Sequence, residues 1–207
     1  DDSYQGTGLI TIDVSKNTAL RTLDLGYNAL FAINVSNNTT LMNLNLGYNI
    51  LTTIDLTSQT ALTNLNLSQN RLTTIGLANN TALTNLNLGF NALTTINIAS
   101  NTALTDLNLG DTQLTTIDLT SHTALTNLNL GYNALTAINL AKNTGLTHLN
   151  LSNNEALSTI DIANNTALTH LNLSNNDALT TIDIANNTAL THLNLTMNAL
   201  TEIDLTS

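Results

Sequence analysis

Two short leucine-rich segments follow one another in residues 83–103, and nearly the whole chain repeats this pair. Residues 83–92 have the pattern Leu-x-x-Leu-x-Leu-x-x-Asn-x, and residues 93–103 have Leu-x-x-Ile-x-Ile-x-x-Asn-x-x. Apolar side chains alternate with polar ones in each half, as in a short strand, so we expect Leu86, Leu88, Ile96 and Ile98 to point inward. One strand this short buries too little apolar surface to be stable. The pattern therefore predicts a solenoid whose stacked copies share one core.

The first leucine of the unit sets the boundaries of the coils. It recurs at a constant interval from residue 20 to residue 146, and the two later intervals, to residue 168 and to residue 190, are each longer by a single position. The longer coils carry the extra residue within 154–157 and 176–179, and these insertions mark turns, because an insertion within a strand would invert its faces. We predict a polar lead-in over residues 1–8 and a single solenoid domain over residues 9–207. Its half coil spans 9–19, and its coils start at 20, 41, 62, 83, 104, 125, 146, 168 and 190.

The composition narrows the class of protein. No helical period occurs, so we expect a β-rich solenoid with two parallel β-sheets of very short strands, one for each half of the unit, and little or no α-helix. The chain has no cysteine, which excludes disulfides and thiolate metal sites. Its net charge of −10, with only four Lys and Arg, argues against nucleic acid as a partner. No apolar run approaches the roughly 20 residues of a membrane helix, so we expect no membrane insertion.

The pattern Leu-x-x-Leu-x-Leu-x-x-Asn in residues 62–70, 83–91 and 125–133 resembles the signature of leucine-rich repeats. Its doubling within one short coil, as in 83–103, resembles the short bacterial subclass called IRREKO, and it is more distantly similar to internalins and BspA-like proteins. The resemblance implies a right-handed solenoid in a bacterial surface or secreted protein. It also implies an extracellular or cell-surface location and a protein or glycan as the partner.

Four aromatic residues occupy the same turn position in different coils, namely Tyr27, Tyr48, Phe90 and Tyr132. Equivalent residues of a solenoid stack into columns, so a binding surface should appear as a column. Exposed aromatic side chains on a polar protein often anchor interfaces. We therefore predict that this aromatic column is the partner-binding site. Packing at the edge of the turns is the structural alternative.

Asparagines form the remaining polar columns. Those in the turns are expected to bond backbone groups that a tight turn leaves unpaired, and Gln59, Thr112 and His122 interrupt these columns. The outward asparagines of the first strands, from Asn45 to Asn194, are expected to bond one another. A hydrogen-bonding surface for a partner is the alternative for this outward column.

Two columns raise the question of a metal. Asp161, Asp183 and Asp204 are successive members of the outward column of the second strands, and their mutual repulsion would be relieved by solvent or by calcium. His148, His170 and His192 should stack on the first strands, but stacking in register does not give the convergent geometry of a metal site. We expect no cofactor and no metal, with calcium at the three aspartates as the weaker alternative.

These patterns predict a non-catalytic binding or adhesion module rather than an enzyme, because catalysis needs an asymmetric cluster of unlike groups. A self-assembling scaffold is the first alternative, since Leu195 and Leu205 should face an open end, and head-to-tail contact would build a filament. The start at Asp1 favours a piece of a longer protein. Ice binding is less favoured, because Thr95 shares its outward face with Asn97 rather than with a second threonine.

Overall fold

The computed structural model describes residues 8–204, so Leu205 and most of the expected lead-in lie outside the described part. The chain forms two compact units, Asp1–Ala103 and Leu104–Ser207. Each unit is a β-solenoid of stacked coils with parallel strands, and no helix occurs between residues 8 and 204. The predicted fold class is therefore confirmed. The described part of the chain contains no helix long and apolar enough to cross a membrane.

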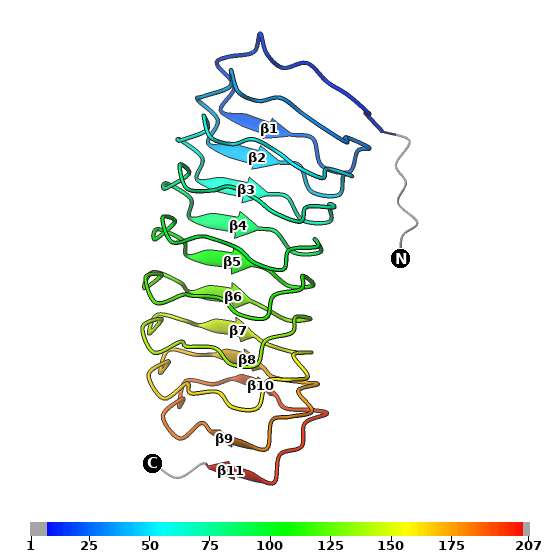
Figure 1. Ribbon diagram of the computed structural model, residues 1–207. Helices are drawn as coiled ribbons and strands as arrows, with labels where there is room; N and C mark the ends of the chain where they lie inside the picture. Colours follow the sequence, from blue (N-terminus) through cyan, green and yellow to red (C-terminus); the bar gives the residue numbers. More distant parts are fainter. Residues whose placement is uncertain (1–7, 205–207) are drawn as a thin grey trace. The chain divides into compact units, whose positions relative to one another are not determined.

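In the first unit, the first half of each coil contributes one very short strand. These strands are β1 (Thr22–Asp24), β2 (Asn43–Asn45), β3 (Asn64–Asn66) and β4 (Asn85–Asn87). They pair parallel in chain order and in register, so that the central leucines Leu23, Leu44, Leu65 and Leu86 form one column. Figure 1 shows them as successive rungs.

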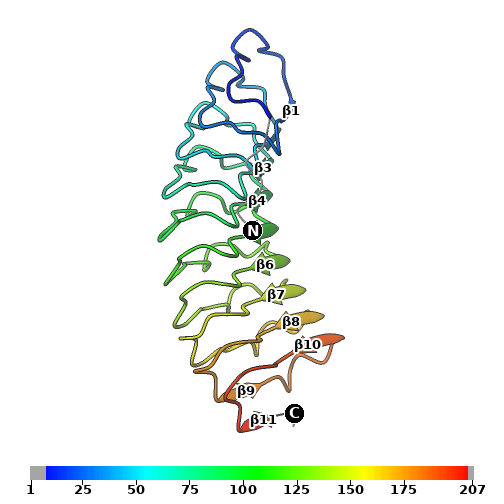
Figure 2. The ribbon, with the colours of Figure 1, turned by 90° about the vertical axis from the view of Figure 1, so that its right-hand side faces the viewer.

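In the second unit, the same position contributes five strands to the described chain. They are β5 (Asp106–Asn108), β6 (Asn127–Asn129), β7 (His148–Asn150), β8 (His170–Asn172) and β10 (His192–Asn194). Each pairs parallel with the next, and the central leucines are again in register. In Figure 2 the labelled strands from β6 to β8 line one side of their coils, and the rest of each coil extends to the opposite side.

The second sheet is shorter than the sequence pattern predicts. Within the described residues, paired strands of the second halves are limited to β9 (Thr181–Asp183) and β11 (Glu202–Asp204). An isolated bridge joins Asn139 to Asp161. Each of these pairs includes one coil that carries the extra turn residue.

The leucines of both halves fill the core. Leu83, Leu88 and Leu93 have no exposed surface, and Leu86 is only 2% exposed. In the second half Ile98 is also buried, but Ile96 is half-buried, although both were expected to point inward. The segments around Ile96 are not paired into a sheet, so the margin of the core stays open to water there.

Candidate binding surface

The turn asparagines of the first halves are part of the scaffold. Asn91 is buried, and its Nδ2 donates to the carbonyl oxygens of Leu67 and Leu88 at 2.9 Å. Its Oδ1 accepts the backbone N–H of Leu72 at 2.9 Å. The amide of Asn91 thus joins its own coil to the preceding one, both as a donor and as an acceptor. The expected structural role of this column is confirmed.

The turn asparagines of the second halves are bonded on one side of the amide. Asn101 is fully buried, and its Nδ2 donates to the carbonyl oxygens of Leu77 and Asn80 at 3.1 and 2.9 Å. Its Oδ1 has no hydrogen-bond partner within the described protein, and the same holds for Asn38, Asn80, Asn143, Asn165 and Asn187. Gln59, which interrupts the column, still donates from Nε2 to the carbonyl oxygen of Val35. This column therefore fastens successive coils through its donors.

The outward asparagines of the first strands bond one another. Asn66 donates from Nδ2 to Oδ1 of Asn45 at 2.9 Å, and Asn45 donates to Asp24 at 2.8 Å. Oδ1 of Asn45 also accepts the N–H of Gly47. In the second unit, Asn150 and Asn129 continue the same kind of ladder. Because these amides already bond within the ladder, the structure favours stabilisation over partner recognition for this column.

The aromatic column lies in turns whose backbone is left-handed. Tyr27, Tyr48, Phe90 and Tyr132 have φ of 57–58°, and their side chains are 39–58% exposed. The backbone N–H of Tyr48 donates to the carbonyl of Ser68 in the next coil, so bonds between coils hold the turn in this conformation. Within the described residues, positive φ outside glycine is confined to this one turn position, and the other five members are Gln69, Asp111, Asn153, Asn175 and Met197.

The four aromatic residues do not form one continuous stack. The rings of Tyr27 and Tyr48 are parallel, with centroids 4.2 Å apart and an interplanar angle of 13°. Tyr132 instead lies between coils that carry Asp111 and Asn153 at the same position. Packing along the turn edge thus accounts for the pair Tyr27 and Tyr48. Phe90 and Tyr132 have polar residues at the same position in neighbouring coils, and about half of their surface is exposed.

The outward aspartates of the second halves form hydrogen bonds within their own turns. Asp161 and Asp183 accept the backbone N–H of Ala163 and Ala185 at 3.0 and 2.9 Å. Where a hydroxyl residue follows instead, it also donates to the carboxylate. The backbone N–H and the hydroxyl of Thr57 together hold the pKa of Asp55 below its usual value.

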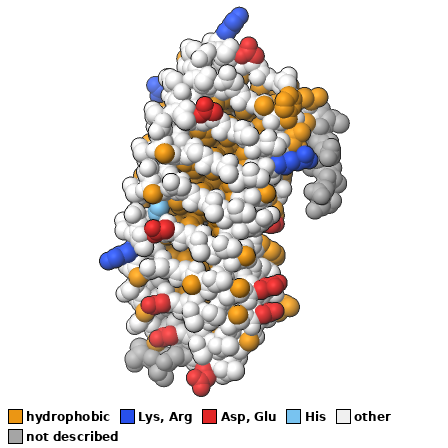
Figure 3. All heavy atoms as spheres, viewed as in Figure 1, with side chains coloured by type: hydrophobic (Ala, Val, Ile, Leu, Met, Phe, Trp, Pro, Cys, Tyr) orange, Lys and Arg blue, Asp and Glu red, His pale blue; other side chains and the backbone are white. Residues whose placement is uncertain are grey.

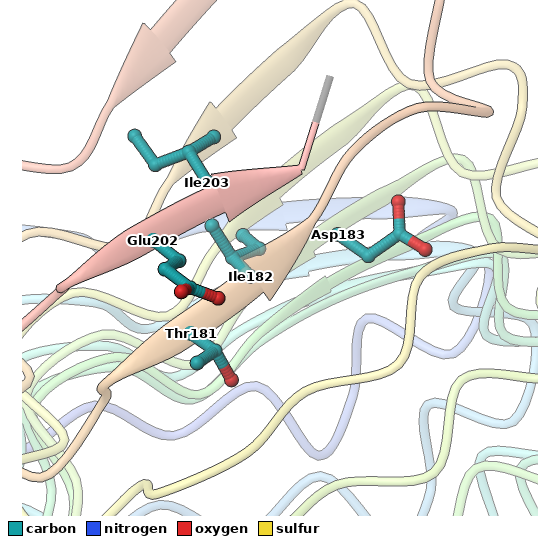
Figure 4. A pocket seen from close by; sticks show the side chains of 5 residues that line it. All are labelled: Thr181, Ile182, Asp183, Glu202 and Ile203. Atoms are coloured by element: carbon teal, nitrogen blue, oxygen red, sulfur yellow. The ribbon is translucent and has the colours of Figure 1, made fainter. Parts of the chain in front are cut away.

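No group of three or more metal-binding side chains that could hold an ion occurs among the described residues. Near the expected calcium site, an open hollow of about 410 Å³ is lined by Thr181, Ile182, Asp183, Glu202 and Ile203. Figure 4 shows the carboxylates of Asp183 and Glu202 at separate ends of this hollow. The side chain of Asp204 lies outside the described part.

We expect calcium to have little effect on this protein, because Asp161 and Asp183 already accept backbone N–H groups of their own turns. Millimolar calcium should change the melting temperature of the wild type and of the triple variant Asp161→Asn, Asp183→Asn, Asp204→Asn equally. Asparagine is a matched replacement, because Asn97 accepts the N–H of Ala99 from the same column position. Differential scanning calorimetry measures both proteins. Stabilisation of the wild type that the triple variant lacks would establish the calcium alternative.

The three histidines stack as expected. The ring centroids of His148 and His170 are 4.3 Å apart, and those of His170 and His192 are 4.1 Å apart. On the face drawn in Figure 3, most atoms belong to the backbone or to uncharged polar side chains.

The comparisons with known proteins agree with the fold. Residues 164–184 match the family model described as Leucine Rich repeat. A leucine-rich-repeat protein from Leptospira interrogans is 25% identical, with a TM-score of 0.78, over 95% of this chain and 60% of its own. The functional domain of InlJ from Listeria monocytogenes is also 25% identical, with a TM-score of 0.56, over 95% of this chain and 58% of its own.

More distant likeness extends to YopM from Yersinia enterocolitica, with 21% identity and a TM-score of 0.75 over 90% of this chain and 39% of that one. This likeness concerns the fold. The chain spans about three-fifths of the length of the InlJ and Leptospira structures. Curated protein sequences give no significant match.

Proposed function

We propose that this chain is a non-catalytic binding module of a bacterial surface or secreted protein, and that it recognises a protein or a glycan through Tyr27, Tyr48, Phe90 and Tyr132. Its short doubled unit makes the IRREKO-like subclass our proposed assignment. The observation that carries the proposal is the left-handed backbone beneath these exposed aromatic side chains.

The left-handed turn makes aromatic residues a poor choice for folding. A residue with a Cβ pays roughly 1–2 kcal/mol in this region, and asparagine tolerates it better than most because its side chain bonds locally. The chain uses asparagine at the same place in Asn153 and Asn175. An aromatic residue there gains little from burial, since Phe90 and Tyr132 are 50% and 58% exposed. A contact with a partner explains the placement better than packing does.

The fold comparisons support a binding role rather than catalysis. The structures that this chain resembles include the functional domain of InlJ and a leucine-rich effector protein of Yersinia pestis. The surface columns of the described chain repeat near-identical groups along each unit, and such columns lack the mixture of unlike groups that a catalytic centre needs. Rigid aromatic anchors on a polar surface suit protein or glycan recognition.

Head-to-tail self-assembly is the second candidate, and a specific observation favours it. Leu193 of β10 is 42% exposed, whereas its equivalent Leu171 in β8 is 2% exposed. Ile203 is 47% exposed. The last described coil thus presents the apolar surface and strand edge onto which another coil would stack. A second copy that stacks there would form an open, non-closing contact.

Replacement of Tyr27, Tyr48, Phe90 and Tyr132 together by asparagine is expected to abolish binding while the melting temperature stays the same or rises by a few degrees. The rise follows from relief of strain in the left-handed turns, and about 1 kcal/mol corresponds to roughly 2–4 °C at this size. A glycan and protein array identifies ligands of the wild type, and calorimetry then compares both proteins on each ligand.

The matched control is Phe31→Thr. Phe31 is 53% exposed but lies outside the turn column, at the position that Thr52 occupies in the next coil. This variant should bind like the wild type. Unchanged binding by the asparagine variant, with a loss of melting temperature, would mean that the column serves packing. Sedimentation of the same samples over a range of concentrations tests the self-assembly candidate.

A further inference from the structure

The stacked histidines replace the residues that the other coils carry at the same place. His148, His170 and His192 lie at the first position of β7, β8 and β10, directly opposite one another in the register. At this position the earlier strands have Thr22, Asn43, Asn64, Asn85, Asp106 and Asn127. The interplanar angles of 13° and 9° make the three rings nearly parallel. We call this group the histidine row.

A threonine contacts each ring of the row. Oγ1 of Thr169 bonds to the carbonyl oxygen of Thr147 at 3.0 Å and lies 2.9 Å from Nδ1 of His170. Thr147 and Thr191 make the same two contacts in their own coils. These contacts hold the three rings in their stacked orientation.

The parallel stacking makes the row a poor metal site. A metal bound by imidazole lies roughly 2.0–2.1 Å from each nitrogen, along converging lone pairs. The stacked rings have parallel lone pairs, and their centroids are 4.1–4.3 Å apart. Convergence on one ion would require the rings to rotate away from their threonines. The row instead offers three similar groups side by side.

Among the described residues, the strand positions beside the row carry no carboxylate. The outward residues of the adjacent column are the neutral amides Asn150, Asn172 and Asn194, and Asn127 precedes the row. Asp106 lies in the coil before Asn127, one coil farther from the row, and its carboxylate accepts a hydrogen bond from Asn127. Burial between the neighbouring rings lowers the pKa of His170, as do the charges of His192 and His148. An external anion would supply the missing counter-charge.

We propose that the histidine row is a proton-gated site for adjacent oxyanion groups, such as the sulfates or carboxylates of an acidic ligand. At neutral pH the protein, with its net charge of −10, repels anions. In mild acid, protonated imidazole rings of the row become charged donors. Bound anions stabilise the imidazolium rings and relieve the repulsion between them. Binding and proton uptake therefore strengthen each other.

The composition makes this row distinctive. The chain has four Lys and Arg and four histidines. The fourth histidine, His122, is a buried turn residue with 1% exposure. The histidine row is thus where the described surface can gain several neighbouring positive charges under mild acid. This inference is independent of the aromatic column and of the partner proposed for it.

Dextran sulfate is a suitable probe, because its sulfates stay charged throughout the pH range, and neutral dextran is its control. We expect the wild type to bind dextran sulfate at least about tenfold more tightly near pH 5 than near pH 7.5, since a one-unit shift in pKa corresponds to a tenfold change in binding. Inorganic sulfate at equal sulfate concentration distinguishes a single-oxyanion site from one that needs neighbouring groups on a polymer.

The triple variant His148→Asn, His170→Asn, His192→Asn should lose the gain at low pH. Asparagine occupies this position in β2, β3, β4 and β6, so the variant keeps a residue that the fold already accepts. His122→Asn, which restores the turn asparagine seen at Asn101 and Asn143, should keep the gain. Equal binding by the triple variant near pH 5 would overturn the proposal.

Nuclear magnetic resonance titration of the imidazole rings provides a second measurement that does not depend on the variant folding. Dextran sulfate should raise the pKa of His170 in the wild type. A pKa that does not change when the probe is added would also overturn the proposal.

Discussion

Replacement of Leu107 by alanine is expected to lower the free energy of unfolding by about 2–5 kcal/mol. Leu107 is the central residue of β5 and is 2% exposed. It pairs in register with Leu128 of β6, within a column of leucines that leaves little room for collapse. Truncation removes buried apolar surface and leaves a cavity between coils. Urea unfolding, followed by far-UV circular dichroism, measures the change.

Leu193→Ala is the matched control for Leu107→Ala. Leu193 has the same place in β10, but it is 42% exposed and so loses less buried surface on truncation. We expect its effect to be less than half that of Leu107→Ala. A cost below about 1 kcal/mol for Leu107→Ala would contradict its place in the core, because deletions from a leucine core rarely cost so little.

The solenoid could be predicted because its buried leucines recur at regular intervals in the sequence. A leucine that returns once in every coil must stack on its equivalents, and Leu44, Leu65 and Leu86 do so in register. Periodicity does not report whether neighbouring backbones come close enough to hydrogen-bond. The short second sheet and the half-buried Ile96 were therefore not predictable from the same pattern.

The candidate binding surface was found by its register, but its backbone conformation was not foreseen. Asn153, Asn175 and Asp111 at the same position are residue types enriched in left-handed turns, and this signal was present in the sequence. In the histidine row, the threonine before each histidine was not a signal, because Thr63 and Thr84 precede asparagine at the same place. The stacking of the rings follows from the register of the strands, which is a property of the fold.

The two columns of turn asparagines show how similar sequence patterns can have different roles. Both halves carry an asparagine after the strand, and both amides donate to carbonyl oxygens of neighbouring coils. The two columns differ in whether the side-chain oxygen Oδ1 accepts a hydrogen bond. Oδ1 of Asn154 accepts the N–H of Leu135 at 3.0 Å, whereas Oδ1 of Asn143 has no hydrogen-bond partner within the described protein.

This difference predicts that Asn154→Ala destabilises the protein more than Asn143→Ala does. Nδ2 of Asn154 donates to the carbonyl oxygens of Leu130 and Leu151 at 3.0 Å, in addition to the bond that its Oδ1 accepts. Asn143 contributes two donor bonds, to Leu119 and His122. Each buried group that loses its partner costs about 1–3 kcal/mol.

We expect losses of about 3–5 kcal/mol for Asn154→Ala and about 2–3 kcal/mol for Asn143→Ala, given these costs and their incomplete additivity. Asn154→Thr is the informative intermediate, because Thr112 fills the equivalent turn and still donates to the carbonyl oxygen of Leu109. It should retain part of the stability that alanine loses. If Asn143→Ala proved the more harmful in urea unfolding, the extra acceptor bond of Asn154 would not be what distinguishes the two columns, and their donors alone would hold the coils together.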